Sequence, residues 1–153
     1  MKSAASIAIA VLISAGHAAA QTSPPLDWRR SDLAPNVPAA TGFTTEVDGA
    51  NYATIVARAQ EDRPLPASSQ MFRGMVFRTE IRCSERRWRI LGASYYSKDY
   101  ALVLESPEVA WAPLVRETPL HSAVTDVCDG GHTGPVGLKT DDPVTVQRWL
   151  DGG

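Results

Sequence analysis

The clearest pattern in the chain is an alternation of apolar odd positions and charged even positions over residues 75–83, interrupted at Val76 and Thr79. The apolar positions are Met75, Phe77, Ile81 and Cys83, and the charged ones are Arg78, Glu80 and Arg82. A half-buried β-strand has this period of two. Residues 84–86 then turn the chain, and residues 87–96 return with Trp88 and Ile90 opposite in phase to Arg87 and Arg89. These two segments predict an antiparallel hairpin.

Shorter patterns predict the other strands. Residues 42–47 suit a first strand, followed by the turn dipeptide Asp48-Gly49, which tolerates positive φ. Residues 51–59 place Ala53, Ile55 and Ala57 on one face, and we favour a strand there over the helix that alanine also permits.

After a proline-containing loop at 61–69 and the long hairpin, a turn at 97–99 leads into a strand at 100–104. Short connections between consecutive strands predict an antiparallel meander. Residues 107–115 are expected to be irregular.

Two helices are predicted late in the chain. In the first, apolar residues recur at helical spacing up to Cys128, with Thr118 as N-cap and Pro119 at the first helical position. The second spans about 142–150, with Asp141 or Asp142 as cap and Pro143 early in the helix. Its apolar face carries Val146, Trp149 and Leu150. The predicted fold class is therefore α+β, a small antiparallel sheet packed by helices.

The N-terminal residues look like a targeting segment. Residues 1–20 combine Lys2, an apolar run at 7–13 and a small-residue end, which is typical of a signal peptide cleaved after Ala20. The run is too short to span a bilayer, which needs about 20 apolar residues. No cysteine lies near the cleavage point to carry a lipid. We expect an exported protein, periplasmic or secreted, that is not lipid-anchored.

Four segments follow from these patterns: a signal peptide at 1–20, an irregular proline-rich leader at 21–40, the main domain at 41–129, and a glycine-rich loop with a short helix at 130–153. Cys83 and Cys128 are the only cysteines of the 153 residues. In an exported protein they are expected to form one disulfide, which would join the sheet to the helix packed on it.

Charge and motif spacing argue against several function classes. The net charge of −2 becomes more negative when Lys2 is removed with the leader, which disfavours nucleic acid as a partner. The stretch 130–140 lacks the Gly-Lys-Ser/Thr step of a phosphate loop. Cys128 and His132 have a zinc-like spacing but too few companion ligands. We therefore expect no metal and no cofactor.

His121, Ser122 and Asp126 are the candidate residues for a hydrolase site. Neighbouring helical residues point about 100° apart, so His121 and Ser122 are poorly placed to share a proton. We expect no catalytic residues, with a small exported hydrolase as an alternative.

Arginines gather on one phase of the predicted hairpin. Arg78, Arg82, Arg87 and Arg89 would share one sheet face, and such a cluster can bind carboxylate, sulfate or phosphate groups. The competing interpretation is a solvated face balanced by Glu80 and Glu85. The aromatic residues of this region are expected to pack in the core or at an interface; they are Trp88, Tyr95, Tyr96, Tyr100 and Trp111.

Several of these residues together resemble the surface-adhesin protein E-like domain family of exported bacterial proteins. The resemblance lies in Cys83 leading into a basic-aromatic strand, the step Trp111-Ala112-Pro113-Leu114, and Cys128 closing a short helix. It covers about residues 70–130. It implies an antiparallel sheet with a disulfide-linked helix and a binding role at the cell envelope, and it is compatible with a homodimer.

The sequence thus predicts an exported, non-catalytic binding module. Its expected partner is an unidentified envelope or host protein or an anionic polymer, and no transmembrane span is expected. A structural periplasmic protein without a small-molecule ligand is the other alternative.

Overall fold

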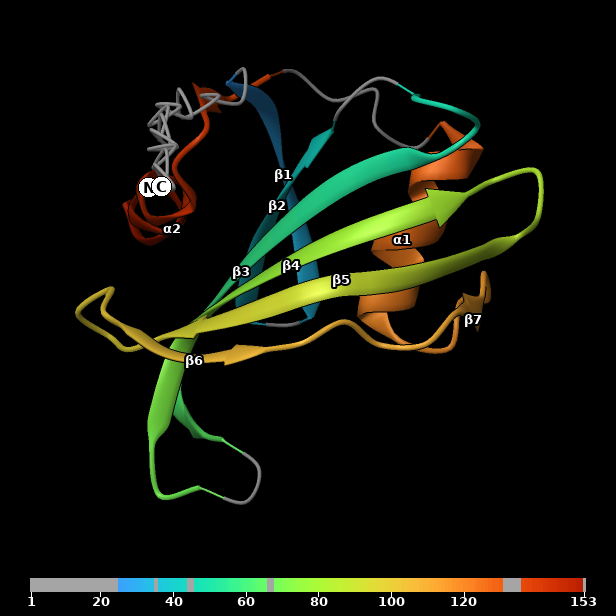
Figure 1. Ribbon diagram of the computed structural model, residues 1–153. Coiled ribbons are helices and arrows are strands. Elements are labelled where there is room, and N and C mark those ends of the chain that lie inside the picture. Colours follow the sequence, from blue (N-terminus) through green and yellow to red (C-terminus); the bar gives the residue numbers. More distant parts are fainter. Residues whose placement is uncertain (1–24, 35, 44–45, 66–67, 131–135, 153) are drawn as a thin grey trace, which may run out of the picture.

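The computed structural model describes residues 25–34, 36–43, 46–65, 68–130 and 136–152. They form one antiparallel sheet of eight strands with two helices (Figure 1). In chain order the elements are β1 (Leu26–Ala34), β2 (Val37–Phe43), β3 (Asn51–Pro64), β4 (Met71–Arg82), β5 (Arg87–Tyr96), β6 (Leu102–Ser106), β7 (Ala112–Pro113), α1 (Pro119–Asp129), β8 (Leu138–Thr140) and α2 (Pro143–Asp151). The sheet order is β6-β5-β4-β3-β2-β1-β8, and β7 pairs with β5 beyond β6. The predicted meander and α+β class are confirmed.

The two helices cover opposite faces of the sheet. Successive strand residues point to opposite sides, and Ile55 and Val56 of β3 belong to different core clusters. The α1 face is built from Ala53, Ile55, Phe77, Ile81, Trp88, Ala93, Leu114 and Val124. The α2 face is built from Trp28, Ala40, Val56, Val76, Val146 and Leu150. Each helix therefore buries one phase of the strand alternation.

A bulge in β5 decides which side chains share a face. Arg78 pairs with Gly92 and Thr79 with Ile90, so Leu91 is an extra residue in β5. One extra residue on one strand reverses the phase of the side chains beyond it. Because of this bulge, Trp88 and Ala93 both lie on the α1 face although one has an even and the other an odd number.

The prediction that residues 21–40 form an irregular leader is wrong for the described part of that segment. Residues 26–34 and 37–40 belong to β1 and β2, which pair with each other and extend the sheet beyond β3. Pro38 is tolerated because pairing of β2 with β3 begins only at Ala39, so β2 has one neighbour there. Trp28 is almost fully buried and its Nε1 donates to the Thr140 carbonyl at 2.9 Å. This long-range anchoring outweighs the local effect of the prolines.

Other element ends also differ from expectation. β2 ends at Phe43 rather than reaching 47, and β3 runs through Pro64 into the segment expected to be a loop. β6 begins at Leu102 because Tyr100 has φ 64° and belongs to the preceding turn. Part of the expected glycine-rich loop forms β8, which pairs with β1. The Asp48-Gly49 turn is confirmed, with φ values of 50° and 75°.

Both predicted helices are confirmed with their caps. The Thr118 side chain accepts a hydrogen bond from the His121 amide, and α1 ends at Gly130 with φ 72°, a left-handed conformation that suits glycine. Asp142 caps α2 by accepting from the amides of Val144 and Thr145 at 3.0 and 3.1 Å. The expected signal peptide lies outside the described residues.

The disulfide between Cys83 and Cys128 is confirmed, with their Cα atoms 5.4 Å apart. Cys83 follows the last residue of β4, and Cys128 lies in the last turn of α1. The bond therefore fixes the end of the helix against the turn between β4 and β5.

We expect Cys128→Ser to lower the free energy of unfolding by about 4 kcal/mol, because the bridge closes a loop of 45 residues in the unfolded chain. Chemical denaturation of the oxidised wild type and the variant measures the difference. Reduction of the wild type should reproduce the loss; a variant as stable as the oxidised wild type would contradict this account.

A buried arginine joins α2 to the sheet. Arg58 of β3 is 2% exposed and donates to Asp151 at 2.9 Å and to the Lys98 carbonyl at 2.7 Å. It also donates to the Gln147 amide oxygen at 3.3 Å, and its guanidinium lies over the Tyr100 ring. Asp151 and Gln147 belong to α2, and Lys98 and Tyr100 belong to the turn between β5 and β6. The arginine therefore ties α2 and the β5–β6 turn to β3.

Gly74 makes room for this arrangement. A Cβ at position 74 would lie 1.8 Å from the Gln147 amide oxygen. We expect Gly74→Ala to destabilise the fold by about 1–3 kcal/mol through overpacking. The double variant Gly74→Ala/Gln147→Ala should be less destabilised than the sum of its single variants. Additive losses in thermal or chemical unfolding would contradict the proposed contact.

Candidate functional site

The four predicted arginines lie on one face of the β4–β5 hairpin. Arg82 pairs with Arg87, Glu80 pairs with Arg89, and Arg78 pairs with Gly92. This is the face opposite to α1, at the end of the strands that α2 does not reach. The structure thus brings these side chains together as the alternation predicted. Whether they bind a partner remains a prediction.

A buried carboxylate organises the arginines. Glu80 is 3% exposed and accepts from Arg89 Nε at 2.8 Å and from Arg82 Nη2 at 3.1 Å. Burial alone would raise the pKa of Glu80, but the hydrogen bonds and charges of Arg89 and Arg82 outweigh it and leave the pKa below its ordinary value. The carboxylate is therefore ionised at neutral pH and holds two guanidinium groups in fixed positions.

Trp111 completes this surface. It lies in the segment between β6 and β7, and the guanidinium carbons of Arg82, Arg87 and Arg89 stand 5.4, 4.6 and 4.9 Å from its ring centroid. Arginine over an indole face gains cation–π attraction and stacking. We call Trp111 with Arg78, Arg82, Arg87 and Arg89 the Trp111 surface. No local pattern in the sequence predicts that Trp111 contacts the arginines.

Most of the charge on the Trp111 surface is balanced. Besides their bonds to Glu80, Arg82 pairs with Glu85 at 3.2 Å and Arg89 with Glu108 at 3.6 Å. Arg87 also pairs with Glu85. Arg78 is exposed and has no ion pair within the described ranges. The balanced-face interpretation thus holds for three arginines, and Arg78 is the cation left over.

We expect Glu80→Gln to destabilise the protein by about 1–3 kcal/mol at pH 7, since it removes an acceptor that two arginines share. The folded-state pKa of Glu80 lies below its ordinary value of 4.5. The ionised carboxylate therefore stabilises the fold fully above pH 4.5, and this stabilisation is lost as the pH falls through the folded-state pKa. The stability difference between wild type and variant should therefore shrink below about pH 4. Urea unfolding at pH 7 and at pH 3 measures it; an equal difference at both pH values would contradict this role.

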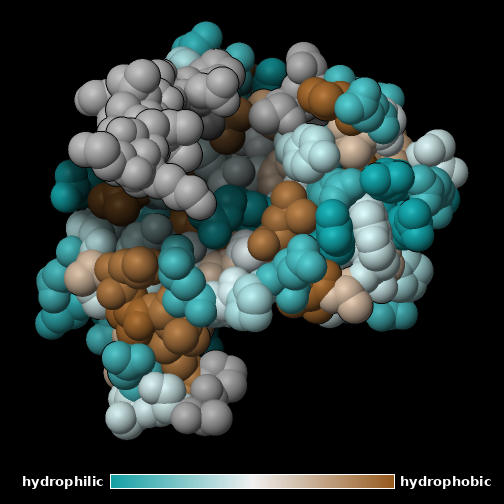
Figure 2. Space-filling view, in the orientation of Figure 1, coloured by the Kyte–Doolittle hydropathy of each residue, from teal (hydrophilic) through white to brown (hydrophobic). Residues whose placement is uncertain are grey.

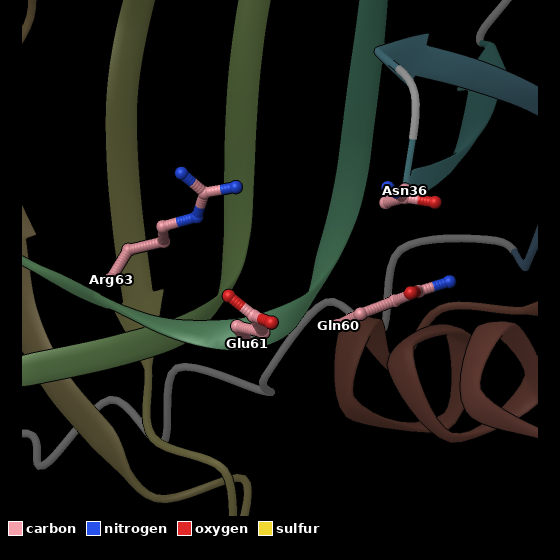
Figure 3. A pocket seen from close by; sticks show the side chains of 4 residues that line it. All are labelled: Asn36, Gln60, Glu61 and Arg63. Atoms are coloured by element: carbon pink, nitrogen blue, oxygen red, sulfur yellow. The ribbon is translucent and has the colours of Figure 1, made fainter.

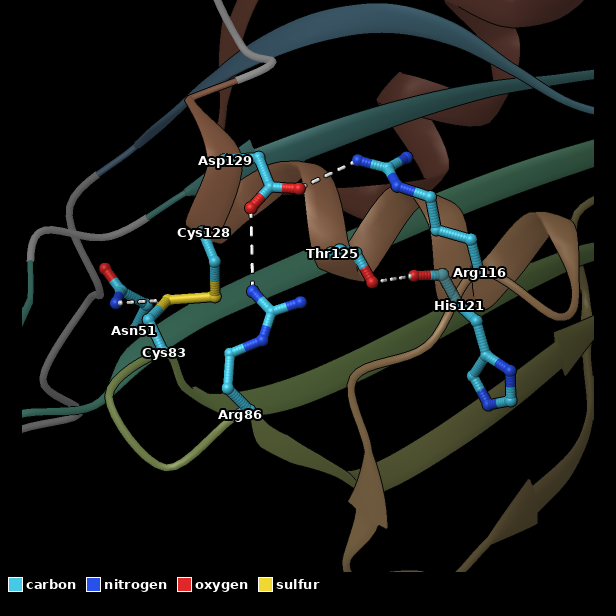
Figure 4. The surroundings of a disulfide bond; sticks show 8 residues. All are labelled: Asn51, Cys83, Arg86, Arg116, His121, Thr125, Cys128 and Asp129. Atoms are coloured by element: carbon cyan, nitrogen blue, oxygen red, sulfur yellow. Dashed lines mark hydrogen bonds and ion pairs between the residues drawn. A yellow bond between two sulfur atoms is a disulfide. The ribbon is translucent and has the colours of Figure 1, made fainter.

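The hydrolase alternative is not supported by the geometry. Asp126 pairs with Arg116 at 2.7 Å, and the His121 ring packs edge-on against Trp88 at a centroid distance of 5.2 Å. Figure 4 shows the imidazole pointing away from Arg116 and Asp129. The Ser122 amide donates to the Thr118 carbonyl inside the helix. None of these contacts, all between described residues, places His121 or Asp126 next to the Ser122 hydroxyl.

The surroundings of the disulfide are also explained by structural contacts. Asn51 Nδ2 lies 3.6 Å from Cys83 Sγ, and Asp129 pairs with Arg116 at 2.9 Å and Arg86 at 3.6 Å (Figure 4). His132, which has a zinc-like spacing from Cys128 in the sequence, lies outside the described residues. Within the described ranges, no cluster of three or more His, Cys, Asp or Glu side chains could hold a metal ion.

Residues that the structure describes line two of the hollows on the surface. One, of about 120 Å³, lies at the bend of β3 and is lined by Asn36, Gln60, Glu61 and Arg63 (Figure 3). These four side chains are all exposed, so water already solvates them. The other, of about 210 Å³, lies between β5, α1 and the segment before β7. It borders the Trp111 surface and is mostly apolar.

Hydrophobic surface also gathers where β6 and the start of β4 lie (Figure 2). Met71, Leu102 and Leu104 are 42–53% exposed there. Nothing in the structure shows what covers this patch. In the part of the chain that the structure describes, no helix is long and apolar enough to cross a membrane.

Comparison with known proteins gives a distant likeness in fold. No family model matches the chain, and no curated protein matches it. The chain is similar to a structure of Haemophilus influenzae protein E, at 14% identity and a TM-score of 0.44, over 74% of this chain and 96% of that one. It is also similar to a crystal structure of protein E from non-typeable Haemophilus influenzae, at 15% identity and a TM-score of 0.46, over 85% of this chain and 94% of that one. Membership of the surface-adhesin protein E-like family remains a prediction.

Proposed function

We propose that the chain is an exported, non-catalytic binding module of the cell envelope that recognises a partner protein through the Trp111 surface. One observation carries this proposal: Trp111 is held against three guanidinium groups, two of which are fixed by the buried Glu80. Tryptophan and arginine are enriched among the residues that dominate binding energy at protein interfaces. Side chains already fixed before binding lose less conformational entropy when a partner docks.

A protein partner fits better than an anionic polymer. A polymer of sulfate or phosphate groups would have to compete with Glu80, Glu85 and Glu108, which already pair with three of the arginines. Among the arginines of the Trp111 surface, only Arg78 has no ion pair with a described residue. A protein can use the indole face and the single cation together.

Export rests on the signal-like N-terminal residues and on the disulfide, because disulfides persist in oxidising compartments. A protein of the envelope or one outside the cell is therefore the appropriate class of partner.

The test is retention of detergent-solubilised envelope proteins on the immobilised full-length chain. We expect a retained protein whose binding falls about 30-fold with Trp111→Ala, as for a residue worth about 2 kcal/mol. Arg78→Gln should weaken binding less, and its effect should disappear near 1 M salt, where exposed charges are screened.

Arg63→Gln is the matched control for Arg78→Gln, because both arginines are exposed and have no ion pair with a described residue, and Arg63 lies with Gln60 and Glu61 away from the Trp111 surface. Circular dichroism confirms that each variant is folded. Retention that is equal in wild type and Trp111→Ala would exclude this surface as the binding site.

A further inference from the structure

The apolar pocket beside the Trp111 surface is built from three elements. β5 contributes Trp88 and Ile90, and the first turn of α1 contributes Leu120. The third element is β7 with the segment before it: β7 contributes Ala112, and the preceding segment contributes Val109 and Ala110. The sequence explains the hollow, because two alanines stand where larger side chains would fill it.

The pocket is held open by fixed backbone. The Val109 amide donates to the Ile90 carbonyl at 2.8 Å, and Ala112 pairs with Trp88 in the β5–β7 ladder. Leu120 lies in the first turn of a helix that is capped by Thr118 and fastened by the disulfide at its other end. The walls are therefore in place before an occupant arrives.

The mainly apolar lining of the pocket favours an apolar occupant. Trp88 and His121 both line the pocket, and their Nε1 and Nδ1 atoms have no hydrogen-bond partner among the described residues, but both atoms are buried and expose almost no surface. An occupant therefore meets mainly carbon. The volume of about 210 Å³ is below the range of about 300–1,000 Å³ typical of small-molecule sites. It suits one large apolar side chain.

The pocket and the Trp111 surface lie on one short segment. Ala110 and Ala112 line the pocket, and the residue between them is Trp111, which faces the arginines. Arg89 borders the pocket and also stacks on Trp111. The four arginines of the surface outnumber Glu80, Glu85 and Glu108 by one. The cation in excess is Arg78, so a partner that fills the pocket and extends past Arg89 onto the Trp111 surface would meet one positive charge without a partner among the described residues.

We infer that the partner protein places a single large apolar side chain in this pocket and an aspartate or glutamate next to it on the Trp111 surface. The inference rests on the proposed function and specifies its partner. The apolar side chain gains by leaving water, and the neighbouring carboxylate meets the excess arginine charge.

The probe is a phage-displayed library of random 12-residue peptides selected on the immobilised full-length chain. We expect enriched peptides to carry a large apolar residue close to Asp or Glu. Fluorescence anisotropy then measures the affinity of a labelled synthetic copy. Replacing the large apolar residue of the peptide with Ala should weaken binding at least about tenfold. Ala110→Phe in the protein, which places a phenyl ring in the pocket, should weaken binding by a similar factor.

Ala101→Phe is the matched control, because Ala101 and Ala110 are both exposed and Ala101 lies outside the pocket. It should leave the affinity unchanged. If Ala110→Phe misfolds, Val109→Asp puts a carboxylate at the pocket rim, where Val109 is 52% exposed, and should weaken binding equally.

The outcomes separate the two proposals. Loss of peptide binding in Trp111→Ala but not in Ala110→Phe would overturn the pocket and keep the proposed function. Binding that neither variant affects would overturn both. Failure to enrich any peptide would overturn the pocket inference. Heparin is the second check. If heparin displaces the peptide, and if heparin binding requires Arg78 but is unchanged in Ala110→Phe, the pocket inference is also overturned.

Discussion

The covalent bond between the end of β4 and the last turn of α1 is the constraint on which the α1 side of the molecule depends. An isolated helix as short as α1 is marginal in water. Here one end is capped by Thr118 and the other is bonded to the sheet. The helix can then bury Val124 in the core and present Leu120 to the apolar pocket. Any occupant of that pocket would rest on a wall that the disulfide helps to position.

On the opposite face, a single carboxylate has the corresponding role. Glu80 is surrounded by arginines that would otherwise repel one another across neighbouring strands. Arg82 and Arg89 each contact Glu80 through Nε and Nη2, along one edge of the guanidinium group, which leaves the flat faces free to stack on Trp111. The hairpin thus presents an ordered surface instead of a set of mobile side chains. A balanced surface of this kind suits selective contact better than general attraction to polyanions.

The features that were predictable from the sequence are the local ones. The period of two along β4 and β5 located the arginines, and the caps at Thr118 and Asp142 located both helices. β1 and β2 were missed because their prolines suggested irregular chain, while the contact that holds β1 joins Trp28 to a residue 112 positions away. Trp111 and the pocket were missed for the same reason. Their positions follow from how the segment after β6 lies against β5, and no local pattern encodes that path.

The arrangement around Glu80 also has a consequence for how this surface can change over evolutionary time. Arg82 and Arg89 share Glu80 as one buried acceptor. Replacing Glu80 alone leaves two arginines without their acceptor, and replacing the arginines one after the other leaves the buried carboxylate only partly paired. Arg78 and Ala110 are exposed and have no such dependence on Glu80. Descendants of this protein could therefore adapt to a new partner by substitutions at the margin, while the group formed by Glu80, Arg82 and Arg89 would be inherited as a unit.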